Sequence, residues 1–388
     1  MLWALTLGSI AILWWVYDGY GRFLAIIVAV RSVFTQTATT ASSVAVADSQ
    51  PSVTVLLTVH NEASVIQRRI ENILSCDYPS RQLEIVVASD GSTDQTNQIV
   101  QGFPDRRVRL FESPGLGKTA TQNAACATIT SDLIVFTDAD IEFDRQFLQA
   151  IARPFTDASV GAVDGRLMYR NAALDDVQAG QGYYWNYELK LRRLESQLGI
   201  LAVVAGACFA VRRSLLREMD PSIGEDCIVP LDIAVQNHRV LHEPAAIAFD
   251  QFDPDTGVTL RRRVRMTLRN WQGTWTRSRL LNPLRSPGYA FALWSHKLLR
   301  WLSPVFLATA TVCSLLLLVR SPSLLTGAAF LPFALLFVLA SCGWLTTRRG
   351  LRIPAAGTAY GFLLANTAFL IGITRAIAGQ RVHSYRNR

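Results

Sequence analysis

The chain has 388 residues, of which 50% are hydrophobic and 18% are charged, and its formal net charge at pH 7 is +8. This length allows one large domain or two of medium size, and the apolar fraction is high for a soluble enzyme. No module that reads or stacks bases accompanies the short arginine-rich runs, so the sequence predicts no nucleic-acid partner. The 6 cysteines include no CxxC pair, which argues against a disulfide framework and a zinc site.

The N-terminal segment, residues 1–34, predicts a membrane anchor. No charge occurs from Leu2 to Tyr17, and a second apolar run follows the short polar stretch that begins at Asp18. A helix of about 20 apolar residues is what a hydrocarbon layer of about 30 Å requires. A cleaved signal peptide is the alternative interpretation, but its basic start and its small-residue cleavage site are missing.

Residues 35–50 are small, polar and without periodicity, which is typical of a linker. From residue 51 to 285, short runs rich in β-branched residues alternate with helical patterns. The runs that predict strands are 52–59, 83–89, 107–112, 132–140, 160–169 and the first part of 205–216, which continues as a helix. The other patterns that predict helices are 62–76, 94–101, 115–129, 174–198, 228–238 and 259–277. This alternation predicts an α/β domain whose mostly parallel sheet carries helices on both faces.

The C-terminal part predicts membrane segments. Residues 286–302 form an amphipathic pattern suited to the membrane surface. The uncharged stretches of the following region, 303–378, are 305–319, 323–345 and 355–374. If all three crossed, the arginines of 346–352 and those of the basic tail, 379–388, would lie on opposite sides, against the positive-inside rule. The last stretch crosses, re-enters or lies at the interface, and the sequence does not decide among these.

Acidic residues follow three of the predicted strands. Glu62 follows the first strand, Asp90 ends the second, and Asp138 and Asp140 close the stretch IVFTDAD. Ligands of such open sheets bind beyond the carboxyl ends of the strands, so we expect these residues to lie at one site. Taken singly, Asp90 suits a turn with the glycine and serine after it, and Glu62 suits a helix cap.

Asp138 and Asp140 are separated by one residue. In a strand such residues point to the same side, so both carboxylates are expected at one point, where Mg²⁺ or Mn²⁺ would find hard oxygen ligands. Two turn residues at a strand end are the alternative interpretation. Lys118 lies in GLGKTATQN, which leads into a helix and so suits a phosphate, although the P-loop spacing is absent.

The segments VTVLLTVHNEASVIQRRIENIL, LEIVVASDGSTDQT, GLGKTATQNAA and IVFTDAD resemble, in this order, the family 2 glycosyltransferases, the inverting group with a GT-A fold. GACFAVRRSLL, GEDCIVPLDIAVQNHRVLHEPAAIAFD and SHKLLRWLSP extend the resemblance toward the membrane-embedded branch that includes cellulose, hyaluronan and chitin-oligosaccharide synthases. The resemblance covers roughly residues 50–300. It implies a Rossmann-like mixed sheet with helices on both faces, between N- and C-terminal transmembrane helices, with the GT-A domain at 51–285.

The resemblance also implies roles for single residues. Glu62 and Asp90 would hold the nucleotide, with Asp90 near the uracil, and Lys118 would lie by the diphosphate. Asp138 would contact the nucleotide side and, with Asp140, bind the metal, Mg²⁺ or Mn²⁺.

Asp226, in the stretch GED, is similar to the general base of these enzymes. Inversion needs one carboxylate to take the proton from the acceptor hydroxyl as that hydroxyl attacks the anomeric carbon. Without the resemblance, Asp226 is better explained as a carboxylate at a helix N-terminus, which the helix dipole favours.

The sequence departs from the family at the QxxRW motif of the processive members. In the best-placed match Arg265 keeps the arginine, while Arg262 replaces the glutamine and Met266 replaces the tryptophan. Arg265 would neutralise the diphosphate, or it is one more basic residue near the membrane. Trp271 or Trp275 would supply the missing sugar platform, or both lie at the membrane interface.

Together these features predict a metal-dependent, membrane-embedded hexosyltransferase that uses a nucleotide sugar, expected to be UDP-linked, to extend a polysaccharide or glycolipid. Its setting would be the inner (plasma) membrane of a bacterium, with multiple passes, lipid contacts and a cytosolic catalytic domain. Non-processive transfer of one sugar to a lipid-linked acceptor is the first alternative. An inactive assembly subunit is the more remote one.

Overall fold

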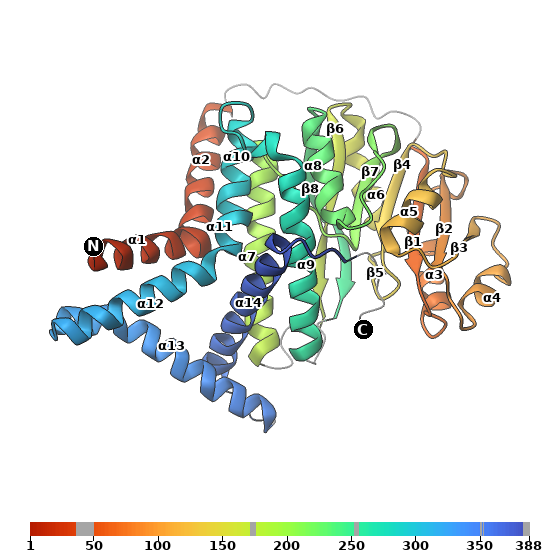
Figure 1. The fold of residues 1–388 in the computed structure, drawn as a ribbon. Coiled ribbons are helices and arrows are strands. Elements are labelled where there is room, and N and C mark those ends of the chain that lie inside the picture. The colour runs from red at the N-terminus through yellow and green to blue at the C-terminus, as the bar shows by residue number, and fades with distance from the viewer. Residues whose placement is uncertain (36–49, 171–175, 252–255, 350, 352, 383–388) are drawn as a thin grey trace.

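The computed structural model describes the whole chain except residues 36–49, 171–175, 252–255, 350, 352 and 383–388 (Figure 1). Nearly all of the predicted linker, 35–50, therefore lies outside the described residues. The sheet and its covering helices lie on one side of the molecule, and the apolar helices from both ends of the chain gather on the other (Figure 1).

One mixed sheet of 8 strands forms the centre of the domain, in the order β3-β2-β1-β4-β7-β6-β8-β5. The strands are β1 (Val53–Val59), β2 (Leu83–Asp90), β3 (Val108–Ser113), β4 (Leu133–Thr137), β5 (Glu142–Phe143), β6 (Val160–Tyr169), β7 (Cys208–Arg212) and β8 (Arg239–Asp250). β1 pairs in parallel with β2 and β4, and β7 runs antiparallel to both β4 and β6. The carboxyl ends of β1, β2, β4 and β6 therefore lie along one edge.

Helices cover both faces of this sheet, as expected. All seven residues of β1 are buried, which explains why its sequence is continuously apolar instead of alternating. On one face α3 (Ile66–Leu74) and α6 (Phe147–Ala152) pack with the cluster that includes Val55. On the other face α5 (Lys118–Cys126) and α8 (Glu225–Val235) pack with the cluster that includes Leu56.

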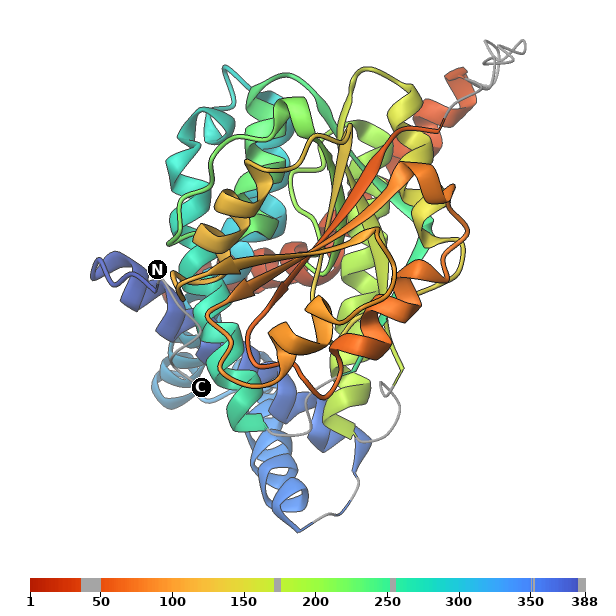
Figure 2. The same cartoon turned by 90° about the vertical axis from the view of Figure 1, so that its right-hand side faces the viewer.

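The remaining helices of the sheet domain lie at its rim or face the apolar helices (Figures 1 and 2). They are α4 (Thr96–Gln101), α7 (Asp176–Leu198), α9 (Thr256–Thr276), α10 (Pro287–Ala292), the π-helical η6 (Leu293–Leu298) and α11 (Leu299–Trp301). Short 3-10 turns are η2 (Ser80–Gln82), η3 (Arg153–Thr156), η4 (Arg213–Leu215) and η5 (Ser278–Leu281).

Two elements differ from the sequence predictions. The twelve-residue strand β8 was not expected, because its stretch HEPAA breaks any alternation of apolar and polar residues. Its pairing with β6 changes register between Gly165 and Arg166, which accommodates the irregular stretch. After β7, where a helix was expected, the chain forms only the 3-10 turn η4.

The apolar helices are α1 (Leu2–Trp14), the π-helical η1 (Trp15–Gly19), α2 (Tyr20–Thr35), α12 (Ser303–Arg320), α13 (Leu324–Arg348) and α14 (Pro354–Ile377). By length and composition, 4 helical segments of the described chain could cross a membrane: Leu2–Phe34, α12, α13 and α14. The last of them also reaches the sheet domain. Gln272 Nε2 of α9 donates a hydrogen bond of 2.8 Å to the backbone oxygen of Gln380, just beyond α14.

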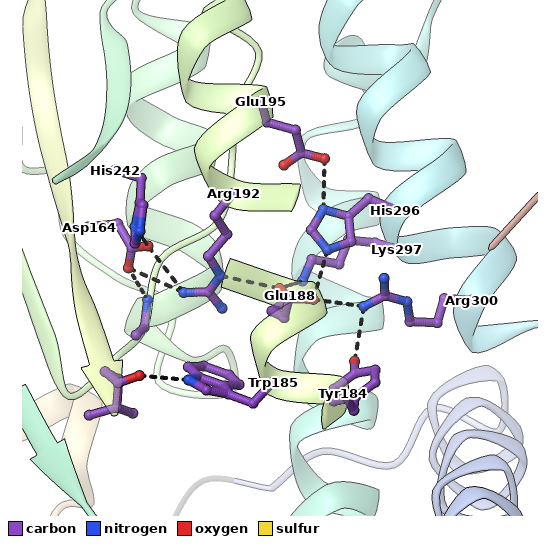
Figure 3. Close-up of polar contacts among 12 residues, drawn as sticks. Asp164, Tyr184, Trp185, Glu188, Arg192, Glu195, His242, His296, Lys297 and Arg300 are labelled. Atoms are coloured by element: carbon purple, nitrogen blue, oxygen red, sulfur yellow. Dashed lines mark hydrogen bonds and ion pairs between the residues drawn. The ribbon is translucent and has the colours of Figure 1, made fainter. Parts of the chain in front are cut away.

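A buried network of charged side chains joins the sheet domain to η6 and α11, which precede the C-terminal apolar helices (Figure 3). Its centre is Glu188 of α7, with 3% of its side chain exposed. The carboxylate contacts four basic groups: Arg192 Nε at 3.2 Å, His296 Nε2 at 2.9 Å, Lys297 Nζ at 3.1 Å and Arg300 Nη1 at 2.7 Å. Burial alone would raise the pKa of Glu188, but these neighbouring charges lower it well below its usual range.

Two more carboxylates extend the network. Asp164 of β6 lies 2.8 Å from His242 Nδ1 of β8. Glu195 of α7 accepts a hydrogen bond of 2.8 Å from the Tyr20 hydroxyl of α2 and lies 2.7 Å from His296 Nδ1. The network therefore connects β6, β8, α7, η6, α11 and α2. Its charged groups are costly to bury without a partner.

A first prediction concerns the crossing of α13 and α14. A Cβ at Gly343 of α13 would collide with the backbone oxygen of Ala356, whereas a Cβ at Gly327 of the same helix would meet nothing within 4 Å. We expect Gly343→Ala to destabilise the protein by about 1–3 kcal/mol through overpacking. Thermal unfolding in detergent measures the effect, with Gly327→Ala as the matched control. Equal unfolding temperatures for the two variants would contradict the observed crossing.

A second prediction concerns the charged network. Glu188→Gln keeps the side-chain shape but leaves three cations buried without their shared carboxylate, so we expect a loss of about 3–5 kcal/mol in the free energy of unfolding. Arg145→Gln, which removes an exposed partner of Asp77, is the control and should leave unfolding unchanged. Chemical denaturation followed by tryptophan fluorescence compares the two.

Candidate functional site

The predicted site residues lie on loops and helix starts at one edge of the sheet. Glu62 follows β1, Asp90 is the last residue of β2, and Asp138 directly follows β4. Lys118 begins α5, and Asp226 is the second residue of α8. The structure thus brings the start of α5 and the start of α8 to the carboxyl end of β4.

Lys118 links two of these elements. Its Nζ lies 2.7 Å from Asp138 Oδ1 and 2.5 Å from Glu225 Oε1, and only 10% of its side chain is exposed. The preceding residue, Gly117, has a φ of 97°, a conformation that favours glycine and turns the chain sharply into α5. The ammonium is thereby fixed between the end of β4 and the first turn of α8.

The sequence predicted that Asp138 and Asp140 close a strand, but both lie beyond the end of that strand. β4 ends at Thr137, and the two aspartates lie in the turn after it, so the rule that places residues i and i+2 on one side of a strand does not apply. Asp138 is half-buried and held by Lys118, whereas Asp140 is exposed. Burial raises the pKa of Asp138, the charge of Lys118 lowers it, and the nearby Asp140 raises it further.

Asp140 borders a hollow of about 100 Å³. Its lining includes Arg69 of α3, Glu142 of β5, Arg170 after β6 and Asp250 at the end of β8. Burial and the charge of Asp140 raise the pKa of Asp250 to about 7, and burial lowers the pKa of Arg69 to about 9. The hollow is therefore lined by both acidic and basic side chains, some of which are shielded from water.

Asp90 is more engaged than the sequence suggested. Its Oδ1 accepts hydrogen bonds from Gly117 N at 3.0 Å and from Thr121 Oγ1 at 2.9 Å, so it fixes the start of α5. Glu62 is half-buried, and its backbone N–H donates to Thr96 Oγ1 at 2.8 Å. Among the described contacts of Asp90, Oδ2 takes part in none, which leaves one of its oxygens for a ligand.

Asp226 differs from its neighbours in having a free carboxylate. Within the described part of the chain, it forms no hydrogen bond or ion pair through its side chain, which is partly exposed. Burial raises the pKa of the Asp226 carboxylate, and the negative charge of Glu225 raises it further. A free carboxylate with a raised pKa is what proton abstraction from a hydroxyl requires.

The basic residue of α9 that lies against this group is Arg269. Its Nη2 donates to Thr119 Oγ1 at 3.0 Å and to the Ile223 backbone oxygen at 2.7 Å. Its charge lowers the pKa of both Glu225 and Asp226. Arg265, the residue that the sequence singled out, lies one helical turn earlier and is half-buried.

The tryptophans considered as a sugar platform belong to a larger aromatic array. Trp271 lies 6.0 Å from Trp275 and 6.1 Å from Trp301, and it packs against the hydrophobic core. Trp275 meets Trp294 of η6 edge to face at 6.5 Å, and 44% of Trp275 is exposed. Of the two candidates, Trp275 is therefore the more exposed ring.

The donor set fits a metal that brings further ligands with it. No group of three or more His, Cys, Asp or Glu side chains in the described residues is arranged to hold a metal ion. Mg²⁺ usually keeps several waters and takes only one or two carboxylates together with substrate phosphates, and Mn²⁺ also prefers oxygen ligands. Exposed Asp140 and half-buried Asp138 can supply these one or two carboxylates.

Sequence reasoning missed several residues of this region: Glu225, Arg269, Arg69 and Asp250. Glu225 was visible in the stretch GED but was not considered. Arg69 lies on the apolar side of α3 with Ile66, Ile70 and Ile73, and an arginine at a helical core position is a recognisable signal. Its Nη2 donates to Thr137 Oγ1 at 2.8 Å, which holds the end of β4.

Residues 54–220 match the protein family described as glycosyl transferase family 2. This part of the chain is therefore similar to the family 2 glycosyltransferases. The matched range contains Glu62, Asp90, Lys118, Asp138 and Asp140 and ends before Asp226.

Curated proteins are similar to this part of the chain. It is 28% identical over 222 residues to the probable glycosyltransferase YdaM of Bacillus subtilis, covering 53% of this chain and 52% of that protein. It is 24% identical over 219 residues to the poly-beta-1,6-N-acetyl-D-glucosamine synthase of Staphylococcus epidermidis, covering 54% and 52%. The beta-monoglucosyldiacylglycerol synthase of Synechocystis is 28% identical over 137 residues, covering 34% and 29%. The chain spans about half the length, or less, of these relatives.

Among solved structures, the chain is similar to the mannosyltransferase PcManGT of Pyrobaculum calidifontis, solved in complex with GDP-Man and Mn²⁺. The TM-score is 0.69 at 19% sequence identity, covering 98% of this chain and 100% of that one. At this identity the likeness concerns the fold. It confirms the predicted GT-A sheet with apolar helices at both ends.

Proposed function

We propose that the protein is a membrane-bound inverting glycosyltransferase that moves a sugar from a nucleotide sugar, expected to be UDP-linked, to a polysaccharide or glycolipid acceptor. The observation that carries the proposal is the free, partly exposed carboxylate of Asp226 next to the Lys118–Asp138 ion pair. The Asp226 carboxylate can accept a proton, and the Lys118 ammonium can supply the positive charge that a leaving diphosphate needs. Acceptor activation and leaving-group stabilisation are the two demands of an inverting transfer.

In this proposal Asp226 takes the proton from the acceptor hydroxyl while that oxygen attacks the anomeric carbon. Glu62 and Asp90 hold the nucleotide, and Asp138 contacts its diphosphate side together with Lys118. Asp140 and Asp138 hold Mg²⁺ or Mn²⁺, which neutralises charge on the leaving diphosphate when bound.

Arg265 is proposed to contact the diphosphate from α9. Arg269, one turn further along, is already held by Thr119 and by the backbone of the loop before α8. Arg269 therefore orients the start of α8, and Arg265 is proposed for direct contact with the donor because of its place in the QxxRW match. An arginine suits diphosphate oxygens because its guanidinium donates two parallel hydrogen bonds.

The acceptor is proposed to reach Asp226 from the membrane side. The interface helices η6 and α11 lie between the apolar helices and the sheet domain (Figure 1), and Lys297 of η6 acts electrostatically on Asp226. Relatives named for a polysaccharide and for a glycolipid product both support such an acceptor. We propose the inner (plasma) membrane, with the catalytic domain in the cytosol, as the setting.

The test of the proposed base is Asp226→Asn. We expect transfer to fall by about 10²–10⁴-fold, because the amide cannot accept the proton, while the nucleotide sugar still binds. UDP release across a panel of UDP-sugars measures transfer, and isothermal titration measures donor binding. Asp157→Asn, an exposed carboxylate at the opposite edge of the sheet, is the control and should retain activity. Normal turnover by Asp226→Asn would rule out the proposed role.

The metal proposal predicts that a chelator abolishes transfer and that Mg²⁺ or Mn²⁺ restores it. Asp140→Asn should raise the metal concentration needed for half-maximal activity, because a carboxylate ligand is replaced by a weaker amide oxygen. A metal titration of transfer by the parent and the variant measures this. Full activity in the presence of excess chelator would contradict metal dependence.

Product length distinguishes polymer synthesis from the transfer of a single sugar. Since Met266 replaces the tryptophan of QxxRW, we expect short products or single additions to a lipid acceptor. Mass analysis of products made with a membrane lipid extract measures their length. Long polymers from Met266→Ala as well as from the parent would show that another residue, such as Trp275, supports the growing chain.

A further inference from the structure

Glu225 and Asp226 are adjacent in the first turn of α8, yet their environments differ. The Glu225 side chain is 6% exposed and pairs with Lys118 Nζ at 2.5 Å, while the Asp226 carboxylate has no described partner. A buried carboxylate is stable only with a compensating charge. Burial would raise the pKa of Glu225, but Lys118 and Arg269 lower it, so this carboxylate stays ionised.

Lys118 in turn has two carboxylates on opposite elements. Asp138 follows β4 and Glu225 begins α8, and each lies within hydrogen-bonding distance of the same ammonium. A lysine ammonium is a compact charge on a flexible stem, so its position depends on what holds it. Removal of the Glu225 carboxylate would take away one of the two ion pairs that fix the Lys118 ammonium between β4 and α8.

We propose that Glu225 is a positioning residue of the transfer reaction: through its ion pair it holds the Lys118 ammonium between Asp138, on the donor side, and the adjacent residue Asp226, the proposed base. This inference rests on the proposed role of Asp226. It adds an electrostatic connection between the two halves of the site, since Glu225 acts on Lys118 through an ion pair and on Asp226 as its neighbour.

The groups that act on Asp226 come from four elements. Glu225 of α8 raises its pKa, and Arg269 of α9, Lys118 of α5 and Lys297 of η6 lower it. Removing the charge of Glu225 leaves only cations in this set. The pKa of Asp226 should then fall, which makes the carboxylate a weaker base and moves its titration to lower pH.

The experiment compares Glu225→Gln with the parent in full-length, detergent-purified protein. We expect the acid limb of the pH profile of kcat to move to lower pH by roughly one unit, with a lower plateau. We also expect the KM for the nucleotide sugar to rise, because Lys118 loses one of the two ion pairs that fix its ammonium. Glu218→Gln, an exposed glutamate shortly before α8, is the matched control and should change neither quantity.

Two further variants keep the inference open to refutation. Glu225→Asp retains the charge but is one methylene shorter, so it should restore the pH profile without restoring the KM. Lys118→Gln removes a cation and should move the acid limb in the opposite direction, to higher pH. If Glu225→Gln does not fold, the pH profile of Lys118→Gln still tests the electrostatic effect of this ion pair on Asp226.

The outcomes separate this inference from the proposed function. If Asp226→Asn is inactive but Glu225→Gln has the parent's pH profile and KM, the positioning role is wrong and the base stands. If Asp226→Asn turns over normally, the proposed function itself fails. A pH shift in the same direction for Glu225→Gln and Lys118→Gln would also overturn the inference, because the two charges have opposite signs.

Discussion

The cost of burying charge without a partner governs how this molecule is joined together. Glu188 is nearly inaccessible and survives as a carboxylate only because four basic groups surround it. Those groups come from α7 itself and from η6 and α11. The packing of the sheet domain against these two helices therefore depends on this carboxylate. Separating the sheet domain from these helices would leave several charged side chains without their partners. The junction is therefore specific in its geometry, because an apolar contact alone would tolerate sliding.

The same constraint operates at the sheet edge, with a different outcome. Asp138 and Glu225 are compensated by Lys118, while Asp226 beside them is left without a described partner. This contrast is the reason why Asp226, and not Asp138 or Glu225, is proposed as the base. The contrast between the adjacent residues Glu225 and Asp226 is more informative than either residue alone, since both occupy the first turn of one helix.

Much of this was accessible from the sequence, for identifiable reasons. Continuous apolar runs marked β1, β2 and β4 because central parallel strands are buried on both faces. The positions of Asp90 and Asp138 followed from where those runs ended. The strand was wrongly predicted to continue through Asp138 and Asp140, because a strand's last residue cannot be fixed from propensity. The ion pair of Lys118 with Glu225 was out of reach, since it joins residues more than a hundred positions apart and depends on the crossing of α5 and α8.

The docking of the last apolar helix on α9 has a consequence for how the surroundings act on the enzyme. Gly372 of α14 fits against Thr267, and Gln380 accepts a hydrogen bond from Gln272, while Arg269 between them holds the loop that precedes Asp226. A change in bilayer thickness or lateral pressure that tilts α14 would be transmitted to α9 within one helical turn of this arginine.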